Sequence, residues 1–479
     1  MTSVPPRRVA LALGLGLVAL VAAAPAAARS GTVTVPLDRA DPAAGTTRVA
    51  YRLIPRRDRS SPAQATILFN PGGPGQAPIG LAAVVRRGLG PLLEHRDLLL
   101  VDPRGAGRSD ALHCRGERDP GLAFAAHDAF IRAIGDCGRR LGPRARMYGS
   151  AAIADDFESV RAELGINTLD LWGESYGTYL MTVFASRHPE HVRSIVLSGA
   201  YPIDFDPWGR DRLAAARHAI RLICARTHAC RGTAVLDDLA HVAARLRHRP
   251  VRFTVGLGKR RYPVVLDEGA LAALVYAGGD PRLLGRVPRA AAAARTGNMG
   301  PLRRLLTEQR RALAALIADP ASAAVFSIAQ GFATECHDYP RAFSYADPLP
   351  ARRAVYDRAL GALDPRPFRP FSPRGWSRAG FEGTDTCLGW PPDPTAAAPL
   401  AADAPLPDVP VLVLSGDLDT NTPPLAGRQA ARQFPHATWA QVANAGHTPT
   451  AGSACAVRLA ARFVTTLTAR PDACAAPRA

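Results

Sequence analysis

A serine near the middle of the chain has the surroundings of a nucleophile. Ser175 lies between Gly173 and Gly177, after an apolar run over residues 168–172 and before a helix-compatible run over residues 179–187. This is the Gly-x-Ser-x-Gly pattern of a tight strand-to-helix turn, in which glycines let the chain pass and the serine hydroxyl projects at the end of the strand. We therefore predict that Ser175 is a nucleophile. An ordinary glycine–serine turn is the alternative interpretation.

A serine nucleophile needs a base to take its proton and an anion to orient that base. His447 lies in a Gly-His turn after a predicted strand at residues 438–442, and Asp419 lies in the turn after a predicted strand at residues 409–414. Asp417 competes for the role of the acid, but Asp419 lies just before the Thr-Pro that opens the next helix. The predicted catalytic residues are therefore Ser175, Asp419 and His447. Their chain order is typical of α/β-hydrolases, whereas other common serine-protease folds use different orders.

A glycine-rich loop follows the predicted strand at residues 65–69. It reads Asn70-Pro71-Gly72-Gly73-Pro74-Gly75, and such loops let backbone N–H groups approach a ligand closely. We predict that the N–H groups of Gly73 and Tyr176 form an oxyanion hole. A phosphate-binding loop is the competing hypothesis, but the loop has no Gly-Lys-Ser/Thr ending and its prolines interrupt a helix start. An ordinary tight loop is the third interpretation.

Strands and helices alternate around these residues, which favours an α/β fold with a mostly parallel sheet. A turn at residues 102–109 is interpreted as structural, with Asp102 and Arg104 as candidates for an ion pair. The predicted strands are 31–37 and 47–54 (an opening hairpin), 65–69, 97–101, 168–172, 194–197, 409–414 and 438–442, and the predicted helices are 152–164, 179–187 and 457–467.

The pattern changes between the sixth and seventh predicted strands. Residues 205–399 are mainly alanine- and arginine-rich helix with one possible hairpin at 251–266, and we interpret them as a lid, because insertions at this edge of a sheet usually select substrate. Near its end, residues 333–338 have no metal-ligand spacing and are interpreted as a capped, disulfide-tied turn. The alternative is that Glu335 or Asp338 faces the pocket. The predicted divisions are 1–28 (signal peptide), 29–204 (core), 205–399 (lid) and 400–479 (core).

Composition narrows the classes of function. The chain has 479 residues, 47% of them hydrophobic, which is ample for a sizeable core. The net charge is +18, but the basic residues are almost all scattered arginines, with a single lysine at position 259 and no interleaved aromatic patch. We therefore expect no nucleic-acid partner, while an acidic partner or an anionic cell surface stays open.

The N-terminus and the cysteines both indicate export. Arg7-Arg8 precede an apolar stretch over residues 9–24 and an Ala26-Ala27-Ala28 cleavage site, which is typical of a signal peptide, with a membrane anchor as the alternative. No other segment is expected to span a membrane. Eight cysteines without a Cys-x-x-Cys motif favour disulfides over metal ligation. Pairing sequence neighbours gives Cys114–Cys137, Cys224–Cys230, Cys336–Cys387 and Cys455–Cys474.

Four motifs carry a resemblance to a known family: residues 70–75, residues 173–178, Cys387-Leu388-Gly389-Trp390-Pro391 and Asp419-Thr420-Asn421-Thr422-Pro423. Together they resemble the secreted tripeptidyl aminopeptidases, relatives of the proline iminopeptidases among the α/β-hydrolase serine peptidases. The resemblance implies an enzyme that removes residues from the free N-terminus of a peptide, through an acyl-enzyme, with acidic lid residues binding the substrate amine. Glu335 is a candidate for that amine. Many members of the wider group have His-Gly-Gly-Pro-Gly where this chain has Asn70-Pro71-Gly72-Gly73, so specificity for proline is not carried over.

Other functions stay open from the sequence. Gly173-Glu174-Ser175-Tyr176 also resembles serine carboxypeptidases, in which the glutamate helps bind a C-terminal carboxylate, but those enzymes have Ala-Gly after the tyrosine. An ester hydrolase on the same triad and a non-catalytic secreted binding protein are the remaining alternatives. A serine at position 175 argues against dehalogenase and epoxide hydrolase chemistry, which need an aspartate there. The favoured prediction is a secreted serine aminopeptidase that releases one residue or three and needs no metal or organic cofactor.

Overall fold

The centre of the molecule is an eight-stranded sheet. The computed structural model describes residues 28–379, 383–401 and 403–475, so the predicted signal peptide lies almost wholly outside the described residues. The strand order is β1-β2-β4-β3-β5-β6-β9-β10, in which the β1–β2 and β2–β4 pairs are antiparallel and all other pairs are parallel. The strands are β1 (Arg29–Pro36), β2 (Thr46–Ile54), β3 (Thr66–Asn70), β4 (Asp97–Val101), β5 (Leu169–Glu174), β6 (Val192–Ser198), β9 (Val411–Gly416) and β10 (Ala437–Val442).

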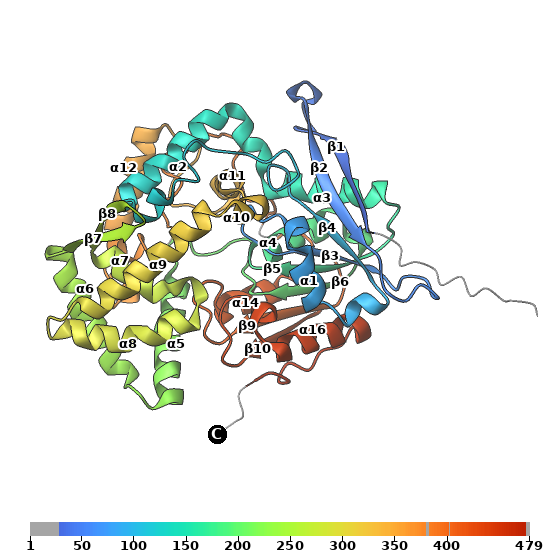
Figure 1. The fold of residues 1–479 in the computed structure, drawn as a ribbon. Helices are drawn as coiled ribbons and strands as arrows, with labels where there is room; N and C mark the ends of the chain where they lie inside the picture. Colours follow the sequence, from blue (N-terminus) through green and yellow to red (C-terminus); the bar gives the residue numbers. More distant parts are fainter. Residues whose placement is uncertain (1–27, 380–382, 402, 476–479) are drawn as a thin grey trace, which may run out of the picture.

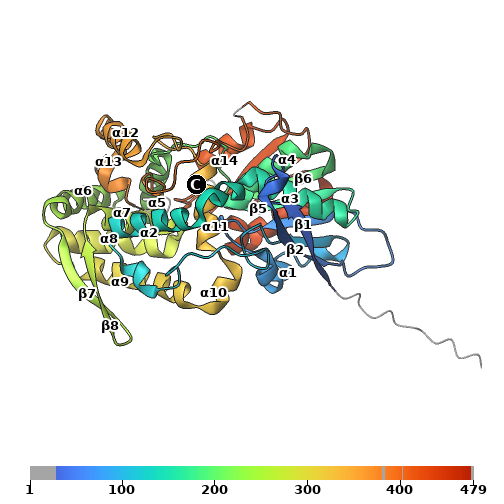
Figure 2. The same cartoon turned by 90° about the horizontal axis from the view of Figure 1, so that it is seen from above.

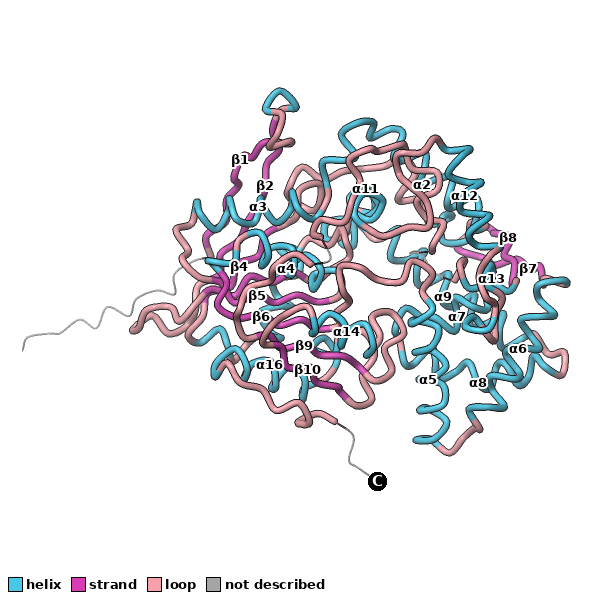
Figure 3. Tube along the Cα trace, turned by 180° about the vertical axis from the view of Figure 1, so that it is seen from behind, coloured by secondary structure: helices cyan, strands magenta, loops and turns pink. Residues whose placement is uncertain are grey.

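Helices cover both faces of the sheet, as Figures 1 and 3 show. The parallel strands are nearly continuous apolar runs because each face must be buried. In β4, Leu98 and Leu100 belong to the apolar cluster on one face, and Leu99 and Val101 belong to the cluster on the other. The first face is covered by α1 (Ala82–Gly88) and α16 (Ala454–Thr466), and the second by α3 (Ser150–Glu163), α4 (Tyr176–Arg187) and α14 (Pro424–Arg432).

Between β6 and β9 the chain leaves the sheet and builds a second body, which we call the helical insertion (residues 205–399). In Figures 1 and 2 it lies to one side of the sheet. It touches the strand-exit loops directly, since the backbone N–H of His447 donates to the carbonyl of Gly279. The insertion contains α5 (Arg210–Thr227), α6 (Gly232–His248), the hairpin β7 (Val251–Leu257) and β8 (Arg260–Leu266), α7 (Glu268–Tyr276), α8 (Pro281–Arg295), α9 (Gly300–Ala318), α10 (Pro320–Val325), α11 (Ile328–Asp338), α12 (Leu349–Gly361) and α13 (Pro373–Trp376).

An earlier segment packs with the insertion rather than with the sheet. Helix α2 (His127–Leu141) contributes Ile131 and Ile134 to the insertion's apolar cluster. A β-carbon at position 135 would lie 2.6 Å from the carbonyl oxygen of Gly389, so only glycine permits this close approach. The body beside the sheet is therefore assembled from two separate stretches of the chain.

Several predictions about the fold are confirmed. The mostly parallel sheet, the opening hairpin and the hairpin near residues 251–266 are present. All four predicted disulfides, Cys114–Cys137, Cys224–Cys230, Cys336–Cys387 and Cys455–Cys474, join the expected partners. Within the described part of the chain, none of the helices has the length and apolar character needed to cross a bilayer.

Two local predictions are wrong. Arg104 does not pair with Asp102; its guanidinium binds Asp156 through two 2.6 Å hydrogen bonds, while Asp102 accepts the backbone N–H groups of Ile79 and Arg108. A buried arginine is best satisfied by a bidentate carboxylate, and α3 supplies one. Residues 333–338 form the end of helix α11 rather than a turn, because the helix continues through Cys336 to Asp338.

Candidate active site

Ser175 occupies a strained turn between β5 and α4. Its φ of 52° and ψ of −124° lie in a region that side chains other than glycine rarely adopt, at a cost of about 1–3 kcal/mol. The turn is held by the Ser175 N–H, which donates to Ser198, and by the Thr178 hydroxyl, which donates to the Ser175 carbonyl. At Gly173 a β-carbon would lie 2.3 Å from the carbonyl oxygen of Gly177, which explains the glycine two residues before the serine.

The structure brings the three predicted catalytic residues into one hydrogen-bonded chain. His447 Nε2 lies 2.8 Å from Ser175 Oγ, and His447 Nδ1 lies 3.2 Å from Asp419 Oδ2. The side chain of Asp419 is fully buried, while that of His447 is 19% exposed. The arrangement can take a proton from the serine and stabilise the imidazolium that results.

The loop after β9 fixes the carboxylate of Asp419. The backbone N–H groups of Asn421 and Thr422 donate to Oδ1 at 2.8 and 3.0 Å, and the Thr422 hydroxyl donates to Oδ2 at 2.7 Å. Asp417, the competing acid, is directed elsewhere, since its Oδ2 accepts Arg226 Nη2 of α5 at 2.6 Å. The geometry therefore places Asp419, and not Asp417, against His447.

The glycine-rich loop after β3 packs against the serine turn. At Gly72, which has a φ of 106°, a β-carbon would lie 2.5 Å from the carbonyl oxygen of Glu174 and 2.9 Å from Ser175 Cβ. Gly73 and Ser175 line the same cavity. Tyr176 is the first residue of α4, where backbone N–H groups have no acceptor within the helix. Both predicted oxyanion donors thus belong to segments that meet at Ser175.

Sequence reasoning missed a connection between the insertion and the site. The hydroxyl of Tyr276, the last residue of α7, donates to Asn421 Oδ1, and Asn421 Nδ2 lies 3.3 Å from His447 Nε2. The backbone of Gly279 makes two further hydrogen bonds: its N–H donates to the Thr420 hydroxyl, and its carbonyl accepts the His447 N–H. The Thr-Asn-Thr-Pro motif was visible in the sequence, but nothing marked Tyr276, which lies in an alanine-rich helix.

Glu174 is a partly buried acid next to Ser175. Its carboxyl accepts the Thr450 hydroxyl at 2.5 Å and lines the cavity that contains Ser175. Burial raises the pKa of Glu174 above its usual range, and the hydrogen bond from Thr450 opposes that shift. The carboxyl therefore holds its proton more readily than a solvated glutamate does, and in that form it can donate a hydrogen bond.

The two acids of residues 333–338 have different surroundings. Asp338 is buried and accepts the backbone N–H of Ser150 at 2.7 Å, so it joins α11 to the start of α3. Glu335 is also buried, lies 3.8 Å from Arg341, and lines a second cavity of about 300 Å³ that also borders Gly73. Of the two, Glu335 is the acid that lines a cavity bordering Gly73.

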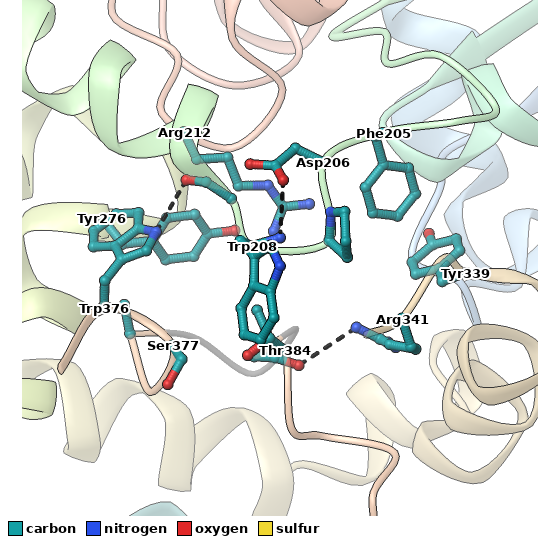
Figure 4. Close-up of a pocket in the computed structure, with 14 residues that line it drawn as sticks. Phe205, Asp206, Trp208, Arg212, Tyr276, Tyr339, Arg341, Trp376, Ser377 and Thr384 are labelled. Carbon is teal, nitrogen blue, oxygen red and sulfur yellow. Dashed lines mark hydrogen bonds between the residues drawn. The ribbon is translucent and has the colours of Figure 1, made fainter. Parts of the chain in front are cut away.

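Figure 4 shows a third cavity, deep in the insertion, where Tyr276 lies beside Trp376 and across from Tyr339 and Arg341. Its volume of about 40 Å³ is close to that of one or two water molecules, so it is too small for a peptide. The cavity that contains Ser175 has about 450 Å³, which is enough to admit part of a substrate.

The chain belongs to the α/β hydrolase fold family, whose pattern matches residues 65–450. Among curated relatives, it is 31% identical over 183 residues to a tripeptidyl aminopeptidase of Streptomyces lividans, covering 35% of this chain and 34% of that protein. It is 28% identical over 200 residues to serine protease Hip1 of Mycobacterium tuberculosis, covering 38% of each chain. The matches thus span little more than a third of these relatives. A solved proline iminopeptidase of Mycobacterium smegmatis aligns with 91% of this chain and 98% of its own, at 14% identity and a TM-score of 0.37.

Proposed function

We propose that this chain is a serine exopeptidase that removes residues from the free N-terminus of peptides. The observation that carries the proposal is the hydrogen-bonded chain Ser175–His447–Asp419 at the strand ends of an α/β hydrolase. Ser175 attacks the scissile carbonyl while His447 takes its proton. His447 then protonates the leaving amine, and the acyl-enzyme is hydrolysed by a water that His447 activates.

The oxyanion of the tetrahedral intermediate would be held by the N–H groups of Gly73 and Tyr176. The contact between the glycine-rich loop and the serine turn supports this assignment, since both donors must converge on one oxygen. The proposed mechanism uses only the triad and these two N–H groups. Among the described residues, no group of three or more histidine, cysteine or acidic side chains is arranged to bind one.

The preference for a free N-terminus is the finer part of the proposal. It is supported by the similarity to a tripeptidyl aminopeptidase and by the buried carboxylate of Glu335 on the cavity that borders Gly73. In this proposal the helical insertion is a lid over the site, and Glu335 pairs with the substrate ammonium. Whether one residue or three are released depends on the distance from that ammonium to the scissile bond.

A panel of amide substrates with free and acetylated N-termini tests the proposal. An aminopeptidase loses activity on acetylation, because the acetylated amine carries no positive charge to pair with the carboxylate. Equal cleavage of free and acetylated substrates would overturn the aminopeptidase assignment. Glu335→Gln should weaken cleavage of the free substrates and leave any residual cleavage of the acetylated ones unchanged.

A serine carboxypeptidase is the second candidate, and Glu174 is the observation that favours it. A protonated carboxyl beside the nucleophile can bind the terminal carboxylate of a peptide. In the same panel, a carboxypeptidase would tolerate acetylation and lose activity when the C-terminus is amidated. An ester hydrolase would prefer esters over both series, and a binding protein would turn over none of them.

We also propose that the enzyme acts outside the cell. Four disulfides are the expected property of a protein that folds in an oxidising compartment. The predicted signal peptide at residues 1–28 agrees with this location. Protein sequencing of the mature N-terminus from culture medium would test both, and recovery of the full-length chain from the cytoplasm would contradict them.

A further inference from the structure

Next to the nucleophile lies a largely apolar cavity, which we call the apolar chamber. It has a volume of about 300 Å³ and is lined by Phe130, Leu313, Ile317, Phe326 and Phe332, among others. These side chains come from α2, α9, the segment before α11, and α11 itself. A cavity of about 150 Å³ is enough for benzene, so the chamber has room for an aromatic or a long aliphatic group.

The chamber and the nucleophile cavity share a wall. Gly73 and Phe326 line both of them, so the chamber opens where the oxyanion loop meets the insertion. Phe326 is fixed there because residues 325–327 pair with the loop. Ala77 N–H donates to Val325 at 2.8 Å, and Ser327 N–H donates to Gly75 at 2.9 Å.

The same two cavities also carry apolar surface that reaches solvent. Among the described residues, three large apolar side chains are strongly exposed, and two of them line these cavities. Leu316 is 56% exposed and borders the chamber, and Val84 is 67% exposed and borders the nucleophile cavity. These two side chains add apolar surface at the outer edges of the two cavities.

The acidic groups on the chamber wall are engaged with the protein. Glu117 accepts the backbone N–H of Cys114 at 2.9 Å and contacts the His113 ring at 2.8 Å, and Glu335 lies 3.8 Å from Arg341. Arg118 and Ser322 are further polar residues of the wall, and the rest of the lining is dominated by aromatic and aliphatic side chains. A charged or strongly polar group placed among these apolar side chains, away from Glu335 and Arg118, would lose its hydration without gaining a partner.

We propose that the apolar chamber binds an apolar group attached to the scissile carbonyl, on the acyl side of the bond that Ser175 attacks. The proposal rests on Ser175 being the nucleophile, as proposed above, but not on recognition of a free N-terminus. The reason is positional. The scissile carbonyl oxygen must point at Gly73 N–H, so the group that the carbonyl carries lies beside Gly73, at the mouth of the chamber. Its occupant is the side chain of an amino acid or the chain of a fatty acyl group.

Ala323 and its neighbour Ala324 allow a matched pair of variants to test the chamber. Ala323 lies on α10, is partly buried and lines the chamber, while Ala324 is exposed and is not among the lining residues. Ala323→Phe should fill the chamber, and Ala324→Phe adds the same group to the outside of the same helix. Ala323→Leu adds a smaller volume and should give an intermediate result if the larger side chain disturbs folding.

Two series of substrates test which apolar group the chamber binds, through their kcat/KM values. One is acetyl, butyryl and hexanoyl p-nitrophenyl esters, which need no amine, and the other is alanyl and leucyl p-nitroanilides. In the wild type, kcat/KM should rise by roughly 4-fold for each buried methylene. Over the four methylenes between acetyl and hexanoyl the rise should reach roughly 200-fold. Ala323→Phe should abolish this rise by lowering the hexanoyl-to-acetyl ratio about 100-fold or more, and Ala324→Phe should change the ratio less than about 2-fold.

The outcomes separate this inference from the proposed function. A rise with chain length that Ala323→Phe removes supports the chamber, and the series in which it occurs identifies an amino-acid side chain or a fatty acyl chain as the occupant. A flat response in both series, or an equal loss for all substrates in Ala323→Phe and Ala324→Phe, would overturn it. Indifference to N-terminal acetylation would overturn the aminopeptidase proposal and leave the ester result intact. Labelling with a fluorophosphonate counts the folded, reactive enzyme in every variant.

Discussion

The nucleophile site and the apolar chamber are neighbours that are built in different ways. The site is made of three loops at the ends of β5, β9 and β10, and backbone hydrogen bonds fix the positions of Ser175 and Asp419. The chamber is made of side chains from α2, α9, α11 and the segment that carries Phe326. The comparison teaches that short turns at one sheet edge can place the triad residues. The lining of the chamber instead depends on side chains from helices that are far apart in the sequence.

The largest effect should follow from removing the nucleophile. Ser175→Ala should lower kcat/KM on any substrate by about 10³-fold or more, because triad residues act as a unit. Thermal unfolding should change little, since the turn is held by backbone groups. Ser186→Ala, at the exposed end of the same helix, is the control and should keep full activity. Substantial turnover by Ser175→Ala would refute the mechanism.

The two aspartates after β9 provide a sharper comparison within the site. Asp419→Asn should lower kcat by about 10³–10⁴-fold, because an amide no longer favours the His447 tautomer that accepts the serine proton. Asp417→Asn should lower activity less than about 10-fold, since Asp417 binds Arg226 rather than His447. Steady-state kinetics of the two variants decide the matter, and a reversed order would make Asp417 the acid.

Removing a hydrogen bond that connects the insertion to the triad should have a moderate effect on kcat. Tyr276→Phe removes the hydrogen bond to Asn421, whose amide lies 3.3 Å from His447 Nε2. Such a bond contributes about 0.5–1.5 kcal/mol, so kcat should fall by roughly 2- to 13-fold while KM changes less. Tyr262→Phe, on the insertion hairpin, is the control. A purely structural role for Tyr276 would instead lower the unfolding temperature without changing kcat of the folded enzyme.

The sequence predicted the site better than the space around it, for a physical reason. Ser175 and Gly73 are found in short motifs, because a tight turn demands particular residues at fixed spacing. Parallel strands then bring these turns to one edge, so chain order alone was enough to relate Ser175 to His447. By contrast, Phe326 and Tyr276 act through packing and contacts across more than a hundred residues. No local pattern distinguishes such side chains from other core residues.

Asp102 and Arg104 show the same limit within the core. Both were correctly placed in a structural turn, but their partners come from distant segments, α3 for Arg104 and the backbone N–H of Ile79 for Asp102. Adjacent opposite charges suggested a pair, whereas burial required a more complete set of hydrogen bonds for each group. The tertiary structure therefore determines which groups Asp102 and Arg104 bind, and their proximity in the sequence does not.

The smallest effect, a change in thermal stability, should come from the contact between α11 of the insertion and α3 of the core. His337 Nδ1 lies 2.7 Å from Asp338, whose other oxygen accepts the N–H of Ser150. Burial lowers the pKa of His337, but the hydrogen bond and charge of Asp338, with the charge of Asp393, outweigh burial and raise it above its ordinary value. The folded protein therefore favours protonated His337.

It follows that His337 stabilises the fold most below its ordinary pKa of about 6.5, and that this contribution is lost as the pH rises through the raised pKa. His337→Gln should lower the unfolding temperature more at about pH 5.5 than at about pH 8.5. The exposed His218→Gln on α5 should show no such difference. A larger loss at the higher pH would mean that burial prevails and that the joint between the two bodies is held by the neutral imidazole.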